Sequence, residues 1–99
     1  METDLFQRDD VKLLALAMLK LETTEECQQF LIDICTRGEI EALAQRLEVA
    51  KLLNEGCTYT HIEKATGAST ATIGRVKRFL HYGAGGYKII LTRLEEERS

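Results

Sequence analysis

The stretch TGASTATIGRVKR, residues 66–78, decides the fold that we expect for this chain. A glycine follows a short helical pattern, small hydroxyl residues come next, and three basic side chains lie near the end. Two short helices joined by a tight turn that begins with glycine are typical of a helix-turn-helix. Thr58 and Ser69 are suitable N-caps for the two helices. The sequence therefore predicts a helix-turn-helix over about residues 58–82.

The predicted second helix of this motif has an apolar face and a small, polar face. The inward positions that would hold the motif together are Ile62, Ala68, Ile73 and Val76. Short side chains near the N-terminus of the second helix would let it approach base edges, while basic residues farther along suit phosphate groups. The residues that we expect to bind DNA are Tyr59, Thr60, His61, Lys64, Ser69, Thr70, Ala71, Thr72, Gly74, Arg75, Lys77 and Arg78.

Charge is distributed unevenly along the chain, whose formal net charge is -3. Residues 1–57 carry six Lys or Arg and twelve Asp or Glu, a balance of -6. Residues 58–82 carry four and one, a balance of +3, and residues 83–99 carry three of each. A basic segment on an acidic body can dock on phosphate while the body is repelled. This distribution favours double-stranded DNA as a partner that binds one face.

Two residues depart from the usual pattern of a DNA-binding helix-turn-helix. Glu63 stands where a small residue is preferred, and Thr66 stands where an apolar one is preferred. An ordinary capped helical hairpin with a solvated basic face therefore stays open as an alternative. So does a protein-interaction module, such as a sigma-factor-like fragment, that uses the same hairpin without DNA.

The rest of the chain also has helical periodicity, and we find no convincing alternation typical of strands. Capping boxes at residues 23–26 and 36–39 open two helices, the second of which should end near Asn54. A last amphipathic helix is expected over about residues 86–97. We therefore expect an all-α fold of about six helices in a single domain of residues 1–99.

The first expected helix, from Asp9 or Asp10 as its cap to about Leu21, is apolar around most of its circumference. Such a helix must be buried on most sides, and one domain of this length offers little interior for it. We therefore expect a homodimer whose N-terminal helices, within about residues 9–54, interlock into one core.

Several other functions are not expected from this composition. Cys27, Cys35 and Cys57 form no CxxC pair, and the Cys57-x3-His61 spacing straddles a predicted helix start, so neither a disulfide framework nor a metal site is indicated. His61 and His81 have no catalytic partner at a recognisable spacing, so an enzyme is not expected. The N-terminus lacks the pattern of a signal peptide, and the densest apolar run is too short to span a bilayer. We expect a cytoplasmic protein.

The stretches "LETTEECQQF", "AQRLEVAKLL", "GASTATI" and "RVKR" carry a family resemblance. Over nearly its full length the sequence resembles the Trp repressor superfamily, and within it most of all the YerC/YecD branch. The resemblance implies an intertwined homodimer that reads palindromic operator DNA. It also implies a transcriptional regulator, a repressor of amino-acid biosynthesis genes, with histidine biosynthesis as one candidate.

The same resemblance bears on a ligand site. In the tryptophan-dependent member of the family, two arginines sandwich the indole ring of the corepressor, and the matching positions here are Arg46 and Arg75. A small residue and a serine of that site are replaced by Val76 and Phe79, which would fill space that an indole needs. Tryptophan is therefore not expected, whereas a small amino-acid-like effector and no effector at all both stay open. The alternative role for Arg46 is an ion pair between neighbouring turns.

Overall fold

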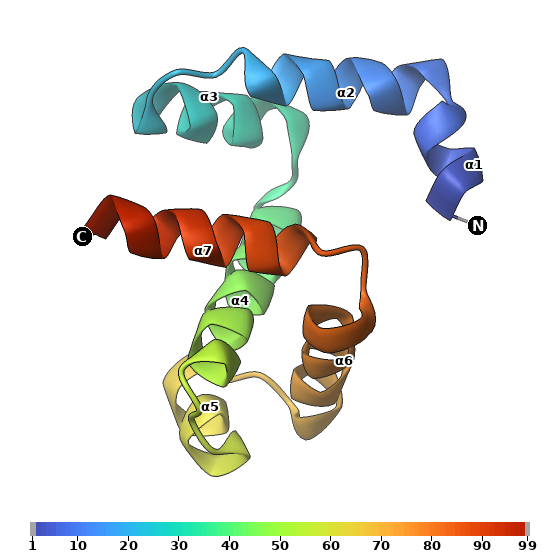
Figure 1. Ribbon diagram of the computed structural model, residues 1–99. Coiled ribbons are helices and arrows are strands. Elements are labelled where there is room, and N and C mark those ends of the chain that lie inside the picture. The colour runs from blue at the N-terminus through green and yellow to red at the C-terminus, as the bar shows by residue number, and fades with distance from the viewer. Residues whose placement is uncertain (1, 99) are drawn as a thin grey trace. The chain divides into compact units, whose positions relative to one another are not determined.

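The computed structural model describes residues 2–98 and shows seven helices and no strand in that range. The all-α fold class is confirmed, with one helix more than about six because the short N-terminal helix was not expected. Contacts divide the chain into two compact units, the first ending at Ile40 and the second beginning at Glu41, inside the fourth helix. The helices are α1 Glu2–Gln7, α2 Asp9–Leu19, α3 Thr24–Ile34, α4 Arg37–Asn54, α5 Tyr59–Thr66, α6 Thr70–Tyr82 and α7 Gly86–Arg98 (Figure 1).

The start of α2 differs from the sequence prediction. Its N-cap is Arg8, in an extended conformation without a side-chain cap, so the prediction that Asp9 or Asp10 caps this helix was wrong. Both aspartates lie in its first turn, where negative charge interacts favourably with the helix dipole. Arg8 donates two hydrogen bonds to Asp10, from Nε to Oδ1 (3.1 Å) and from a terminal nitrogen to Oδ2 (2.7 Å). These bonds hold the pKa of the Asp10 carboxyl below its ordinary value.

Both capping boxes are confirmed. The backbone N–H of Glu26 donates to Oγ1 of Thr23 (3.1 Å), and Oε1 of Glu26 accepts from the N–H of Glu22, one residue before the cap (2.8 Å). At the start of α4 the N–H of Glu39 donates to Oγ1 of Thr36 (3.1 Å), and the N–H of Thr36 donates to Oε1 of Glu39 (2.8 Å). The two helices therefore begin where local sequence alone places them, because each box satisfies backbone N–H groups that the helix leaves unpaired.

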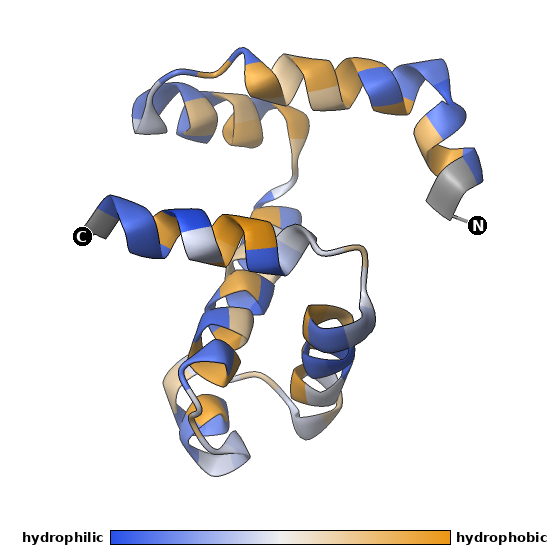
Figure 2. Cartoon of the chain, in the orientation of Figure 1, coloured by the Kyte–Doolittle hydropathy of each residue, from blue (hydrophilic) through white to orange (hydrophobic). Residues whose placement is uncertain are grey.

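The N-terminal unit has no buried side chain in α2 or α3. Figure 2 shows that α2 consists largely of hydrophobic residues and that α3 mixes hydrophobic and hydrophilic ones. Leu13 is 68% exposed and Leu19 is 80% exposed within the single chain. Apolar surface of this extent is unusual on a monomeric protein and is typical of a face that another chain covers.

The C-terminal unit contains a core of its own. Its buried side chains come from α4, α5, α6, α7 and the turn between α5 and α6, and they are Val49, Ala50, Ile62, Ala68, Ile73, Val76, Leu80 and Leu91. The four inward positions predicted from sequence all lie in this core. The helix-turn-helix is therefore held in place by packing within one chain.

The boundaries of the helix-turn-helix match the sequence prediction. Thr58 and Ser69 cap α5 and α6 through their side chains. Gly67 follows α5 with φ at 74°, a left-handed conformation that glycine adopts without the steric cost of a side chain, and its N–H donates to the carbonyl of Glu63 (2.9 Å). The glycine that begins the turn is thus required by backbone geometry.

Candidate nucleic-acid interface

One face of α5 packs toward α6 and the core, and it carries Tyr59, Ile62, Glu63 and Thr66. This spacing of three and four residues puts the four side chains on one side of a helix. Ile62 is fully buried, whereas the other three are half-buried. The face therefore combines one apolar anchor with three polar groups that can contact the neighbouring element.

The turn between α5 and α6 is held by hydrogen bonds that involve Thr66. Its hydroxyl donates to the carbonyl of Ile62 (2.7 Å) and accepts from the N–H of Ala68 (3.1 Å). Nε2 of Gln45 on α4 donates to the carbonyl of Thr66 (3.2 Å). The hydroxyl at this position gives the N–H of Ala68 a partner that an apolar side chain could not supply. The departure from the usual motif at Thr66 is thus compensated locally.

The first turn of α6 carries three hydroxyl groups, each with a defined partner. Oγ of Ser69 accepts from the N–H of Thr72 (3.1 Å) and also donates to Oγ1 of Thr72 (3.1 Å). Oγ1 of Thr70 donates to Oε2 of Glu63 across the turn (2.6 Å). The last bond links the two helices of the motif and gives Glu63 a structural partner.

The face of α6 opposite the core is lined by small residues and then by basic ones. Ala71 and Arg78 are exposed there, and Gly74 lies on the same side. A methyl group added at Gly74 would have no heavy atom within 4 Å, so packing in this chain does not require glycine. Glycine inside a helix costs about 0.5–1 kcal/mol relative to alanine. An unneeded helix-interior glycine on an exposed face is consistent with close approach by another molecule.

Basic residues flank this small face. Arg75 and Lys77 are both exposed, and Nζ of Lys77 lies 5.7 Å from the centre of the Tyr59 ring on α5. That distance is within the range of a cation–π interaction, which orients the ammonium group beside α5. The structure thereby brings Tyr59 and Lys77, both expected to bind DNA, to the same side of the motif.

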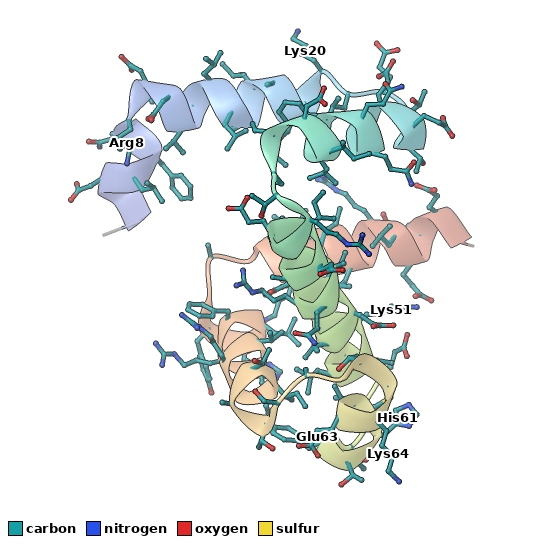
Figure 3. All side chains as sticks on the ribbon, turned by 180° about the vertical axis from the view of Figure 1, so that it is seen from behind. Arg8, Lys20, Lys51, His61, Glu63 and Lys64 are labelled. Atoms are coloured by element: carbon teal, nitrogen blue, oxygen red, sulfur yellow. The ribbon has the colours of Figure 1, made fainter. Side chains whose placement is uncertain are left out.

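Other predicted DNA-binding residues lie on a different face of α5. Thr60, His61 and Lys64 are exposed. His61 and Lys64 project from the side of α5 away from α6, whereas Glu63 projects toward α6 (Figure 3). His61 and Lys64 are therefore not gathered with the exposed residues of α6. They could contact only a partner that also extends along the outer side of α5.

The two arginines of the predicted effector site come together on one pocket within the C-terminal unit. The pocket has a volume of about 280 Å³ and is lined by Arg46, Thr72, Arg75, Val76 and Phe79. The alternative for Arg46, a surface or interhelical ion pair, stays a prediction. Thr72 lines the same pocket.

Sequence reasoning missed three residues that shape the motif: Gln45, Glu63 and Thr66. The last two were visible only as departures from the usual pattern, and nothing in the local sequence pairs Glu63 with a hydroxyl seven residues later. Gln45 gives no local signal, because its partner lies 21 residues away.

Residues 2–98 contain neither a candidate metal site nor a candidate membrane span. No group of three or more His, Cys, Asp or Glu side chains is arranged to hold a metal ion. None of the helices described is long and apolar enough to cross a membrane.

Comparison with known proteins gives consistent results. A sequence model of the Trp repressor protein family matches residues 9–95. YerC, an uncharacterized protein of Bacillus subtilis, is 50% identical over 96 residues, which cover 97% of this chain and 92% of that protein. These matches confirm the resemblance seen in the sequence.

Solved structures agree with the sequence matches. A candidate Trp repressor from Staphylococcus aureus superimposes with a TM-score of 0.89 at 47% identity, covering 96% of this chain and 95% of that one. A TrpR-like protein from Eubacterium eligens also has a TM-score of 0.89, at 46% identity, covering 93% of this chain and 95% of that one. The chain therefore belongs to the Trp repressor family, a class of DNA-binding regulatory proteins rather than enzymes.

Proposed function

We propose that this protein is a cytoplasmic, sequence-specific transcriptional repressor that binds a palindromic operator as a homodimer through α6. The observation that carries this proposal is the division of α6 into two faces. Ile73, Val76 and Leu80 anchor one face in the core. The other presents small residues near the N-terminus and basic residues beyond them, which is how a helix enters the major groove and holds the backbone.

The homodimer follows from the N-terminal unit. Its apolar side chains are exposed in a single chain, and burying them between two chains supplies a hydrophobic driving force for association. Two copies of α6 related by a two-fold axis would face successive major grooves, with half-sites about 34–36 Å apart. The expected operator is therefore roughly palindromic.

A titration against selected and scrambled duplexes at several salt concentrations tests the DNA-binding role. We expect Lys77→Ala and Arg78→Ala to weaken binding to all duplexes similarly, and each to reduce the salt slope by about 1. We expect Ala71→Leu to reduce the affinity for the selected duplex by about 1–3 kcal/mol and to change scrambled-duplex binding much less. Equal losses on both duplexes for Ala71→Leu would mean that α6 does not read bases.

The same experiment distinguishes the main alternative. A monomer that is indifferent to DNA would favour a protein-interaction module, such as a sigma-factor-like fragment. If the protein does bind DNA, a genome-wide map of bound sites would identify the regulated genes. The proposed class is amino-acid biosynthesis genes, including those of histidine biosynthesis.

A specific observation also favours a regulatory ligand. Arg46 and Arg75 line one pocket, so a small amino-acid-like effector could bind them through its carboxylate. Val76 and Phe79 occupy the same pocket and disfavour an indole ring. Calorimetric titration with a panel of amino acids tests this part: tryptophan is expected not to bind, and a ligand that does bind should lose affinity in Arg46→Ala.

A further inference from the structure

The hydrogen bond between Glu63 and Thr70 is unexpected on a DNA-binding surface. Glu63 is the one acidic residue among residues 58–82, and a carboxylate near phosphate groups weakens binding to any duplex. It lies on the side of α5 that faces α6, and its Oε2 accepts from Oγ1 of Thr70 at 2.6 Å (Figure 3). Thr70 is the first residue of α6, where a negative charge also interacts favourably with the helix dipole.

The chemistry of this pair defines the direction of the bond. An ionised carboxylate has no hydrogen to donate, so the hydroxyl hydrogen of Thr70 must point toward Glu63. The lone pairs that remain on Oγ1 of Thr70 can only accept. An isolated threonine hydroxyl could rotate and act as either donor or acceptor, so Glu63 removes one of two possible hydrogen-bonding roles.

We propose that Glu63 holds the Thr70 hydroxyl as an acceptor and thereby makes α6 select base pairs that present an amino hydrogen at that position. This inference rests on the proposed DNA-binding function. In the major groove the amino groups are N6 of adenine and N4 of cytosine, whereas O6 of guanine and O4 of thymine are acceptors. An acceptor-only hydroxyl pairs with the first two and is repelled by the others.

The charge of Glu63 has a second, separable consequence. Because Glu63 repels phosphate whatever the base sequence, its charge lowers the affinity for every duplex, whereas its effect through Thr70 depends on the base. Glu63 is thus a positioning residue that acts on the bases through Thr70 and on the phosphate groups of the DNA through its charge.

Selection of bound sequences from a random duplex library tests the hydroxyl role. The wild type is compared with Thr70→Val, which identifies the base pair that Thr70 reads, and with Glu63→Ala. We expect that base pair to be adenine or cytosine on the contacted strand, preferred at least about fivefold in the wild type. In Glu63→Ala the preference should fall below about twofold, because the hydroxyl can then also donate to guanine or thymine.

A double-mutant comparison separates the hydroxyl role from the charge. Glu63→Gln should raise the affinity for a scrambled duplex about twofold at low salt, both in the wild type and in Thr70→Val, because the charge effect does not need the hydroxyl. Glu63→Ala should have no further effect on base preference once Thr70 is valine. Glu96→Gln on α7 is the matched control, since it removes the same charge outside the motif and should leave base preference unchanged.

The outcomes distinguish the inference from the proposed function. If the wild type selects no sequence, the proposed function itself fails. If it selects a sequence but the base on the strand that Thr70 contacts is guanine or thymine, or Glu63→Ala keeps the full preference, the role of Glu63 is overturned. A selected sequence that is unchanged in Thr70→Val also overturns it. Should Glu63→Ala fail to fold by circular dichroism, Glu63→Leu takes its place.

Discussion

The two units of this chain place their apolar side chains in opposite ways. In the C-terminal unit Val49, Ile62 and Ile73 are fully buried against neighbouring helices of the same chain. In the N-terminal unit neither α2 nor α3 buries a side chain, although α2 is the most apolar segment of the protein. The C-terminal unit therefore gains stability from a core of its own, whereas the N-terminal unit leaves apolar side chains exposed that the proposed homodimer would bury.

The largest expected effect comes from adding a charge to the exposed apolar face of α2. Leu16→Asp should prevent association of the proposed homodimer. Because folding and association are coupled in an interlocked dimer, the same substitution should lower the free energy of unfolding by more than about 3 kcal/mol. Sedimentation measures association, and denaturation at several protein concentrations measures the free energy of unfolding. Lys12→Asp on the same helix is the control and should change little. A Leu16→Asp variant that stays stable and associated would contradict the proposal that a second chain covers this face of α2.

The next effect concerns the core of the C-terminal unit. Ile73→Ala should lower the free energy of unfolding by about 2–4 kcal/mol, because it removes a fully buried side chain and leaves a cavity. Ile89→Ala on α7, where half of the side chain is exposed, should cost less than about 1 kcal/mol. Urea denaturation measures the difference. Equal losses would indicate that another chain covers α7 as well.

A smaller effect, of opposite sign, is expected within α6. Gly74→Ala should raise the free energy of unfolding by about 0.5–1 kcal/mol, since a methyl group there meets no neighbour and alanine favours helix. The same substitution should weaken binding to the selected duplex. Ala71→Gly is the reciprocal control and should destabilise by a similar amount. A Gly74→Ala variant that is more stable and binds equally well would remove the argument for close approach at this position.

The smallest effect is expected at the start of α2. In Arg8→Ala the pKa of Asp10 should rise toward its ordinary value of 3.8, because the hydrogen bonds from Arg8 that lower it are lost. With Arg8 present, the folded-state pKa is lowered, so the pair stabilises the fold above pH 3.8 and loses this contribution as pH falls through the lowered pKa. Titration of the Asp10 carboxyl by NMR checks the direction, and an unchanged pKa would contradict it.

Local sequence predicted most helix boundaries well because their signals are local. The capping boxes that begin α3 and α4, the caps Thr58 and Ser69, and Gly67 each act within three or four residues of themselves. The start of α2 was mispredicted because two aspartates there resemble caps, whereas a short preceding helix makes Arg8 the connecting residue. Helix α1 was missed because six residues without a capping signal carry little periodic information.

The candidate site was predicted in part, because some of its signals are also local. Periodicity identified which side of α6 faces the core and which side is free, so the positions of Ala71 and Gly74 followed from spacing alone. It could not show that His61 and Lys64 lie away from α6 while Glu63 faces it, because the rotation of α5 relative to α6 depends on how their side chains pack. The predicted DNA contacts of these residues stay predictions.

The sequence by itself determined α3 to α7, the caps of α3 to α6, the glycine of the turn and the uneven distribution of charge, since each depends on neighbours along the chain. Only the tertiary structure decided which distant groups meet. It placed Gln45 on the carbonyl of Thr66 and the carboxylate of Glu63 on the hydroxyl of Thr70. The physical reason is that hydrogen bonds and pockets between helices require the packing angles of a folded core, which no local pattern encodes.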